Sequence, residues 1–362
     1  MPERVRIAVL GAGRFASEAH IPGIKAHPGA ELIALYSRSR EQAERVAAAV
    51  GGVPEIALDL DALLARADVD AVTVPSSDDN HYHYTMAALR AGKHVFCEKP
   101  LAVRADLAAE MAREARARNR INQVAFIFRY TYGLQHLRQL VKQGDVGEPY
   151  YVAISWEGQS DVGAGRRRTW RDSAATYGAG WISELGSHFF DTVNWVVAPV
   201  ADVCAITHAI PRTVVDEQGR DHPHETSDLA NVLFHTTGTA KGEINISNIS
   251  PPPPGVDNPW AQVVGAKGSL YTTLTRGNGE VLRRRRPGGK WEDVRLPDEA
   301  YDGAPHAMFR MLGSYVDACL RGGIDRDQDA DFGEGYQVQS ALDQVVASAR
   351  SRRFEPVATA FA

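Results

Sequence analysis

The sequence predicts an α/β fold: an N-terminal doubly wound parallel sheet, followed by an α+β domain with a mostly antiparallel sheet. Three observations support this prediction. Four apolar residues, Ile7–Leu10, run directly into a glycine-rich turn near the start of the chain. Short apolar runs then alternate with segments of helical length as far as Phe126. Beyond Phe126, short apolar runs are separated by glycine turns, which is typical of antiparallel strands.

The opening stretch has the composition of a buried strand that turns tightly into a helix. Gly11 permits the turn, Gly13 lets the backbone approach a pyrophosphate, and the small Ala16 lets helix and strand pack closely. Free amides at the start of the helix attract phosphate. The stretch therefore predicts a dinucleotide site formed by Gly11, Gly13, Arg14 and Phe15, and an ordinary glycine-rich βα turn is the alternative.

Composition sets the broad class of protein. A chain of 362 residues is long for one core, so we expect two domains, at 1–126 and 127–362. The formal net charge of -5 gives no basic field for nucleic acid or an acidic membrane. Three widely spaced cysteines match no zinc spacing, and we expect reduced thiols, no metal and a cytoplasmic protein. No secretory signal or membrane-spanning apolar run is recognised.

The first domain reads as alternating strands and helices, which predicts a parallel sheet whose ligands lie beyond the carboxyl ends of its strands. The predicted strands are Ile7–Leu10, Glu31–Tyr36, Ala71–Val74, His94–Cys97 and Asn122–Phe126. The predicted helices are Phe15–His27, interrupted by Pro22, a helix ending at Gly51, Leu60–Ala67, Tyr82–Arg90 and Ala105–Asn119.

The end of the second strand bears on the choice of nicotinamide cofactor. An acidic residue there would hold the adenosine ribose of NAD, whereas an arginine accommodates the extra phosphate of NADP. The residues are Ser37, Arg38, Ser39 and Arg40, two cations and no carboxylate, which favours NADP over NAD. Alternatively, Ser39 caps the next helix in a capping box with Gln42, and Arg40 lies in solvent.

Two other strand ends carry polar side chains. Glu98 and Lys99 follow the strand HVFC, where an ammonium group can hydrogen-bond a ribose or a substrate hydroxyl. An exposed lysine paired with Glu98 is the alternative. The turn from Ser76 to His81 suits a nicotinamide ribose, although His81 can equally be only the start of the next helix.

Four blocks of sequence carry a family resemblance: GAGRFA at 11–16, AGKHVFCEKP at 91–100, GEPYYV at 147–152 and GWISELGSHFFD at 180–191. In these blocks, whose order and spacing cover nearly the whole chain, the sequence resembles the Gfo/Idh/MocA family of oxidoreductases. The resemblance implies a nicotinamide-dependent enzyme acting on sugars, polyols or related secondary alcohols. It also implies a Rossmann domain followed by a domain with a large open sheet, which often forms the subunit interface.

The resemblance assigns roles to single residues. Lys99 matches the catalytic lysine of the EKP motif, and His188 matches the histidine that exchanges the substrate proton. Glu184 stands where many members have aspartate, a change that keeps the charge and lengthens the side chain. Arg171 matches an arginine often found in the family, and we expect it to contact substrate together with the neighbouring Trp170.

The second domain begins with a predicted helix at Tyr132–Gln143 and a strand at Glu148–Glu157. After a loop, 180–197 reads as a helix, which places Glu184 and His188 one turn apart on one face. A carboxylate so placed can fix the histidine tautomer and stabilise its imidazolium, and a plain surface pair is the alternative. Aromatic residues near this helix, Trp156, Trp170, Tyr177 and Trp181, could stack on a sugar or pack in a core or interface.

The remainder of the chain supplies the antiparallel sheet and two closing helices. The arginine run 166–168 reads as solvated surface, and His222 and His224 read as a flexible loop in preference to a metal site. Predicted strands lie at Asp202–His208, Leu229–His235, Ala240–Ser247, Ala261–Val264, Ser269–Leu274 and Glu280–Arg285, and predicted helices at His306–Arg321 and Phe332–Ser351.

These assignments lead to an expected reaction, hydride transfer between a nicotinamide and a secondary alcohol of a sugar-like molecule. His188 takes the hydroxyl proton, Glu184 orients it, and Lys99 stabilises the developing alkoxide, provided that Lys99 and His188 meet over one nicotinamide ring. An NAD-dependent glycosidase using transient oxidation and a nucleotide-binding sensor without catalysis are the alternatives. We expect a homodimer or homotetramer formed through the C-terminal sheet, with no nucleic acid or membrane partner.

Overall fold

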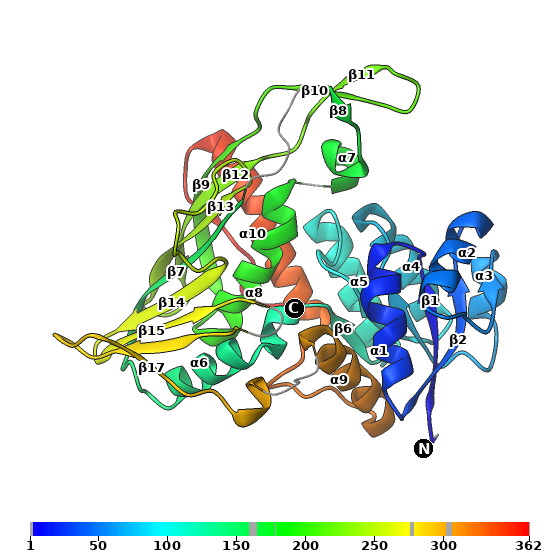
Figure 1. Cartoon of the computed structure of the whole chain (residues 1–362), viewed down its shortest axis with the longest axis horizontal. Coiled ribbons are helices and arrows are strands. Elements are labelled where there is room, and N and C mark those ends of the chain that lie inside the picture. The colour runs from blue at the N-terminus through cyan, green and yellow to red at the C-terminus, as the bar shows by residue number, and fades with distance from the viewer. Residues whose placement is uncertain (1–2, 159–164, 178, 276–278, 302–305, 362) are drawn as a thin grey trace. The chain divides into compact units, whose positions relative to one another are not determined.

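A computed structural model describes residues 3–158, 165–177, 179–275, 279–301 and 306–361. The chain forms two compact units, Met1–Ile127 with Pro305–Tyr336, and Phe128–Ala304 with Gln337–Ala362 (Figure 1). The first division lies one residue beyond the predicted boundary at 126. The segment Pro305–Tyr336 also belongs to the first unit, whereas the predicted second domain included all of residues 127–362. The segment joins the first unit because its helix α9 (Ala307–Arg321) packs beside helix α1 (Ile21–Ala26).

The first unit is built on six parallel strands in the order β3-β2-β1-β4-β5-β6. This order reverses direction between β1 and β4, as in a doubly wound Rossmann sheet, and it confirms the predicted fold class. The strands are β1 (Val5–Leu10), β2 (Ala30–Tyr36), β3 (Ile56–Ala57), β4 (Ala71–Val74), β5 (His94–Cys97) and β6 (Asn122–Val124).

The helices of this unit follow the predicted order, with one local change. The glycine turn leads into a π-helical segment, η1 (Ala16–His20), which continues as α1, and Pro22 stands at the start of α1. Proline has no amide hydrogen to donate to the helical hydrogen-bond ladder, and the wider π-helical segment η1 lies just before Pro22 in the chain. The other helices are α2 (Arg40–Ala49), α3 (Leu60–Leu64), α4 (Asp78–Arg90) and α5 (Ala105–Ala117).

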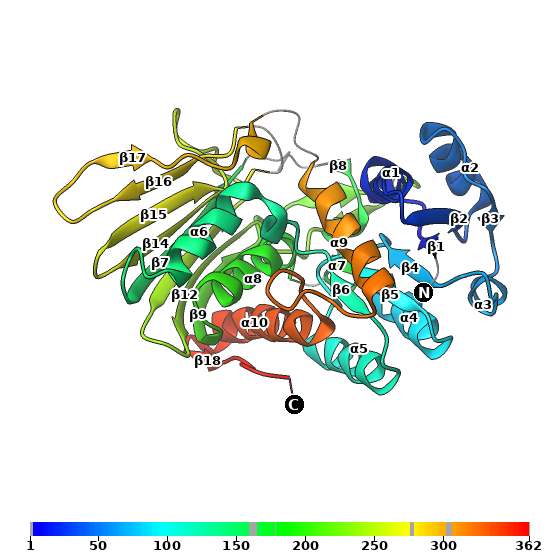
Figure 2. The same cartoon turned by 90° about the horizontal axis from the view of Figure 1, so that it is seen from below.

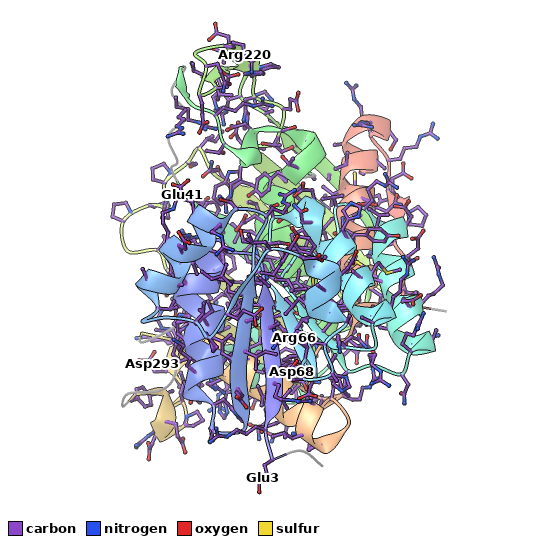
Figure 3. The ribbon with its side chains drawn as sticks, turned by 90° about the vertical axis from the view of Figure 1, so that its right-hand side faces the viewer. Glu3, Glu41, Arg66, Asp68, Arg220 and Asp293 are labelled. Atoms are coloured by element: carbon purple, nitrogen blue, oxygen red, sulfur yellow. The ribbon has the colours of Figure 1, made fainter. Side chains whose placement is uncertain are left out.

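Helix α2 begins as predicted, but its capping box is absent. The Ser39 hydroxyl accepts a hydrogen bond from the Gln42 amide at 3.3 Å. The Gln42 side chain donates to the carbonyl of Ala12 at 2.8 Å, and so it ties α2 to the glycine turn. Figure 3 shows another local tie of this unit, the ion pair of Arg66 with Asp68 in the connection between α3 and β4.

The large sheet of the second unit has nine described strands in the order β17-β16-β15-β14-β7-β13-β12-β9-β18. Among the described strand pairs of this sheet, β7 and β13 run parallel and the other pairs run antiparallel, which confirms the mostly antiparallel prediction. The strands are β7 (Pro149–Glu157), β9 (Val200–His208), β12 (Leu229–Thr236), β13 (Lys241–Ser247), β14 (Trp260–Gly265), β15 (Gly268–Thr273), β16 (Leu282–Arg285), β17 (Trp291–Asp293) and β18 (Glu355–Pro356).

Helices cover one face of this sheet. Figure 2 shows α6 (Tyr132–Lys142), α8 (Ser187–Val196) and α10 (Phe332–Ser351) side by side on it. Alternate residues of β12 are buried and exposed, and Ile206 and Leu233 are exposed on neighbouring strands. None of the helices in the described part of the chain is long and apolar enough to cross a membrane.

The second unit also contains a small sheet that the sequence did not predict. It joins β8 (Arg166–Arg167) to β10 (Thr213–Val215) and β10 to β11 (Asp221–Pro223). Figure 3 shows Arg220 at the outer end of this hairpin, where it pairs with Asp216 at 2.8 Å. The predicted flexible loop around His222 is therefore wrong, because the hairpin ladder orders it.

Candidate functional site

The predicted cofactor residues all lie at one edge of the parallel sheet. They follow β1, β2, β4 and β5, which are neighbours in the order β2-β1-β4-β5. Because parallel strands end at a common edge, residues separated by up to 88 positions meet there.

The glycine turn after β1 lies against the loop after β4. Gly11 has a φ of 127°, and a Cβ at this position would lie 3.1 Å from the Cα of Ser76. A Cβ at Gly13 would lie 3.7 Å from the carbonyl oxygen of Pro75. Only glycine combines this φ with so close an approach, and the resulting turn fits a pyrophosphate held by backbone amides.

Three other predicted cofactor residues follow β1 and β2 and differ in their exposure to solvent: Arg14, Ser37 and Arg38. Arg14 is exposed, pairs with Glu18 at 3.1 Å and places its guanidinium carbon 5.2 Å from the centroid of the Phe15 ring. Ser37 is buried, and its hydroxyl accepts a hydrogen bond from the Ser39 amide at 3.1 Å. Arg38 is exposed at the end of β2, where it is accessible to a ligand.

His81 is fully buried and lies between two of these loops. Its Nδ1 is 2.7 Å from the carbonyl oxygen of Pro100, and its Nε2 is 3.2 Å from that of Ser76. Burial lowers the pKa of His81. The ring therefore ties the loop after β4 to the loop after β5, while direct contact of His81 with a cofactor stays a prediction.

Glu98 and Lys99 are buried rather than exposed, so the alternative of a surface lysine is wrong. One Glu98 oxygen lies 3.0 Å from Nε2 of His20, and the other accepts from the Lys99 amide at 3.3 Å. Burial raises the pKa of Glu98, but the hydrogen bond with His20 and the charge of Lys99 outweigh burial and lower it. Glu98 is thus a buried carboxylate that accepts from the amide of Lys99, a residue that is only 8% exposed.

Sequence reasoning missed His20. It lies on η1, directly after the glycine turn, and its ring packs edge-on against Phe96. A histidine in an apolar helix face gives no local sign of a carboxylate 78 residues away.

In the second unit, His188 is buried at the start of α8. The centroid of its ring lies 4.8 Å from that of Phe128. One turn further along α8, Asp191 forms a buried pair with Arg129, whose Nη2 lies 2.6 Å from the carboxylate. The pair fixes the helix that carries His188.

Glu184 lies in a π-helical segment, η4 (Ile182–Gly186), which continues directly as α8, so the helix predicted over 180–197 is present and begins with a π-helical segment. Its carboxylate accepts a hydrogen bond from the Tyr177 hydroxyl at 2.8 Å, and Nε of Arg171 lies 3.6 Å from the same oxygen. The Arg171 guanidinium also lies over the Tyr177 ring, 5.7 Å from its centroid. The structure thus brings the predicted Arg171 and Glu184 together, and it adds Tyr177 as their shared neighbour.

The predictions for the tryptophans near this helix and for the arginine run 166–168 have different outcomes for different residues. The rings of Trp156 and Trp181 stack, with centroids 5.0 Å apart, whereas the side chain of Trp170 lies outside the described residues. Arg166 pairs with the buried carboxylate of Asp172, so its assignment to solvated surface is wrong. Among the described residues, no group of histidine, cysteine and acidic side chains could hold a metal ion.

Comparison with known families assigns the chain. Residues 5–126 match the family model of an oxidoreductase family with an NAD-binding Rossmann fold, and residues 134–271 match the GFO/IDH/MocA C-terminal domain. The chain belongs to the GFO/IDH/MocA oxidoreductase family. This membership agrees with the strand order of the first unit and with the glycine turn at Gly11.

Individual relatives within the GFO/IDH/MocA family cover different shares of the chain. An uncharacterized oxidoreductase of Synechocystis is 30% identical over 73% of this chain and 70% of its own length. An inositol 2-dehydrogenase of Klebsiella pneumoniae is 33% identical over 43% of this chain, which spans about half (47%) of that relative. The crystal structure of an NAD binding oxidoreductase from Klebsiella pneumoniae has a TM-score of 0.85 at 26% identity, covering 98% of this chain and 99% of that one.

Proposed function

We propose that this GFO/IDH/MocA protein oxidises or reduces one secondary alcohol carbon of a sugar, polyol or inositol-like molecule. The observation that carries the proposal is the cluster of Arg171, Tyr177 and Glu184. Within this cluster, Glu184 stands four residues before the buried His188. Such a cluster offers a neutral hydroxylated molecule both hydrogen-bond donors and acceptors. The likeness to an inositol 2-dehydrogenase supports the same class of substrate.

The residues of the first unit suit a nicotinamide dinucleotide. Gly11 and Gly13 would cradle the pyrophosphate, and Ser76, Glu98 and Lys99 would lie along the ribose. The nicotinamide supplies a carbon that accepts or returns the hydride. We propose NADP in preference to NAD, because Arg38 is exposed at the end of β2 and no carboxylate follows that strand before Glu41.

The chain's own groups would move the proton and the charge. His188 takes the proton from the substrate hydroxyl, and Glu184 orients the substrate and the imidazole. Lys99 stabilises the alkoxide that develops as the proton leaves. The hydrogen bond with His20 and the charge of Lys99 lower the pKa of the buried Glu98, so a carboxylate directly precedes Lys99 in the chain.

The test is the appearance of the reduced-nicotinamide absorbance with NAD and with NADP across a panel of inositols, aldoses, sugar alcohols and glucosides. We expect reduction with one group of polyols, and a lower KM for NADP than for NAD. Lys99→Met should abolish turnover while nucleotide binding persists, and retained turnover would refute the role given to Lys99. Cleavage of a glucoside without net cofactor reduction would instead identify a glycosidase, and binding without reaction would identify a sensor.

We also propose that the protein assembles as a homodimer or homotetramer through the nine-stranded sheet. Ile206 on β9 and Leu233 on β12 are exposed large apolar side chains on adjacent strands, which favours burial against a second copy. Sedimentation equilibrium of the purified protein measures the oligomer size. A Leu233→Lys variant should sediment as a smaller species, and an unchanged mass would argue against this interface.

A further inference from the structure

The connection between β11 and β12, residues 224–228, contacts two parts of the second unit that carry proposed substrate residues. On one side it meets the turn that bears Arg171, η3 (Trp170–Asp172). On the other it meets the start of the helix that bears Glu184. We refer to these five residues as the 224–228 segment.

The contacts with the Arg171 turn are hydrogen bonds to its backbone. The Thr226 hydroxyl donates to the carbonyl oxygen of Arg171 at 2.9 Å. The Glu225 amide donates to the carbonyl oxygen of Asp172 at 3.0 Å, and the Glu225 carboxylate accepts from the Ala174 amide at 3.1 Å. Because Thr226 is buried, its hydroxyl has little competition from water and holds the turn in place.

The contacts with the Glu184 helix are backbone contacts. The Trp181 amide donates to the carbonyl oxygen of Ser227 at 3.2 Å. Gly180 has a φ of 75°, and a Cβ there would lie only 2.7 Å from the Ser227 amide nitrogen. The absence of a side chain at Gly180 is therefore what lets the start of the helix rest on the segment.

His224 links the segment to Asp172 of the Arg171 turn and to Arg212. Its Nδ1 lies 2.9 Å from a carboxylate oxygen of Asp172, and its Nε2 lies 2.9 Å from Nη2 of Arg212. A guanidinium can only donate, so Nε2 is the acceptor and Nδ1 carries the hydrogen that is given to Asp172. Arg212 is held in turn by two hydrogen bonds to the buried carboxylate of Asp228, at 2.6 and 2.9 Å.

The charges of this network balance without a charge on His224. Arg166 and Arg212 face Asp172 and Asp228, and the neutral imidazole, 4% exposed, links the two pairs. A shift within this network would separate a buried carboxylate from its guanidinium, so the network favours one arrangement. The carboxylate at the end of the Arg171 turn is thereby fixed to the start of β12.

We propose that Thr226 and His224 are positioning residues for the substrate side of the site. They set the 3.6 Å separation of Arg171 from Glu184, and the inference rests on the proposed function, in which these two side chains serve a sugar or polyol. Neither positioning residue touches the reacting atoms. Loosening the segment is expected to weaken substrate binding more than it slows the chemical step.

A matched set of variants tests this proposal. Thr226→Val keeps the side-chain shape and removes the hydroxyl, Thr226→Ser keeps the hydroxyl, and Thr236→Val is the control. The control hydroxyl is also buried, and it donates to the Ala240 carbonyl oxygen at the same 2.9 Å, but on β12 away from the 224–228 segment. We expect Thr226→Val to raise the KM for the polyol on the order of tenfold, with kcat within about threefold of the parent. Thr226→Ser and Thr236→Val should leave KM within about twofold.

A purely structural role gives a different result. It would lower the folded fraction, and hence the apparent kcat, and leave KM unchanged for Thr226→Val. His224→Leu should shift KM in the same direction as Thr226→Val, whereas His224→Asn, which can still donate to Asp172, should shift it less. A parental KM in a folded, active Thr226→Val enzyme would overturn the proposal.

Hydrogen exchange of the peptide 165–177, measured by mass spectrometry without substrate, provides a readout that does not depend on turnover. We expect faster exchange in Thr226→Val and in His224→Leu than in the parent and in Thr236→Val. If the parent enzyme oxidises no polyol, the proposed function fails, and the exchange rates still report whether the segment holds the turn. Unchanged exchange in both variants would overturn the positioning role.

Discussion

The Asp172 carboxylate should stabilise the second unit in a way that disappears in acid. It is fully buried and accepts hydrogen bonds from the Thr169 amide and hydroxyl at 2.7 and 3.0 Å, from His224 at 2.9 Å and from Arg166. Burial raises its pKa, but the ion pair with Arg166 and these hydrogen bonds outweigh burial and lower the pKa from 3.8 to about 2. Every partner is a donor, so Asp172→Asn would place its NH2 group against other donors.

The magnitude follows from linkage between protonation and folding. A pKa lowered from 3.8 in the unfolded chain to about 2 in the folded protein stabilises the fold by about 2.4 kcal/mol at pH 5 and above. This contribution is present above the unfolded pKa and is lost as the pH falls through the folded pKa. At pH 3 about 1.3 kcal/mol remains, so about 1 kcal/mol is lost between pH 5 and pH 3.

The assay is urea unfolding of the parent and of Asp172→Asn between pH 5 and pH 3. All six tryptophans lie in the second unit, so their fluorescence reports the unfolding of that unit. We expect the difference in free energy of unfolding between the two proteins to shrink by about 1 kcal/mol over this range. The control is Asp293→Asn, whose carboxylate is exposed and pairs with Arg283 at the surface, with an expected effect under about 0.5 kcal/mol. A difference that stays constant with pH would refute the reasoning.

Three further predictions follow from the described contacts. Gly11→Ala forces a residue with a Cβ into a φ of 127° and places this Cβ 3.1 Å from the Cα of Ser76. It should therefore weaken nicotinamide dinucleotide binding on the order of tenfold, as measured by isothermal titration calorimetry. Unaltered affinity would contradict the role of Gly11 in holding the pyrophosphate. Tyr177→Phe removes the hydroxyl that holds Glu184, and we expect kcat/KM for the polyol to fall on the order of tenfold with an unchanged cofactor KM. A fall in cofactor affinity would point away from a substrate role. Asp191→Ala removes the carboxylate buried against Arg129 and should destabilise the second unit by about 3–5 kcal/mol, whereas a loss under about 1 kcal/mol in tryptophan-monitored unfolding would exclude a structural pair.

The sequence by itself determined the elements whose pattern is local. The buried strands Ala71–Val74 and His94–Cys97 have the predicted bounds, because a short apolar run between turn residues specifies a buried strand. The glycine turn at Gly11 was equally readable, since its chemistry depends on neighbouring positions in the chain. The mostly antiparallel character of the second sheet followed in the same way from glycine turns between short apolar runs.

Tertiary structure alone decided which polar groups are buried together. His20 meets Glu98 and His224 meets Asp172, across separations of 78 and 52 residues that no periodicity connects. A charged or polar side chain is stable in the interior only when its partners are in place, and those partners come from other elements of the fold. The same reason explains why His224 reads as part of a loop in the sequence, yet in the folded chain it is a buried link between two ion pairs.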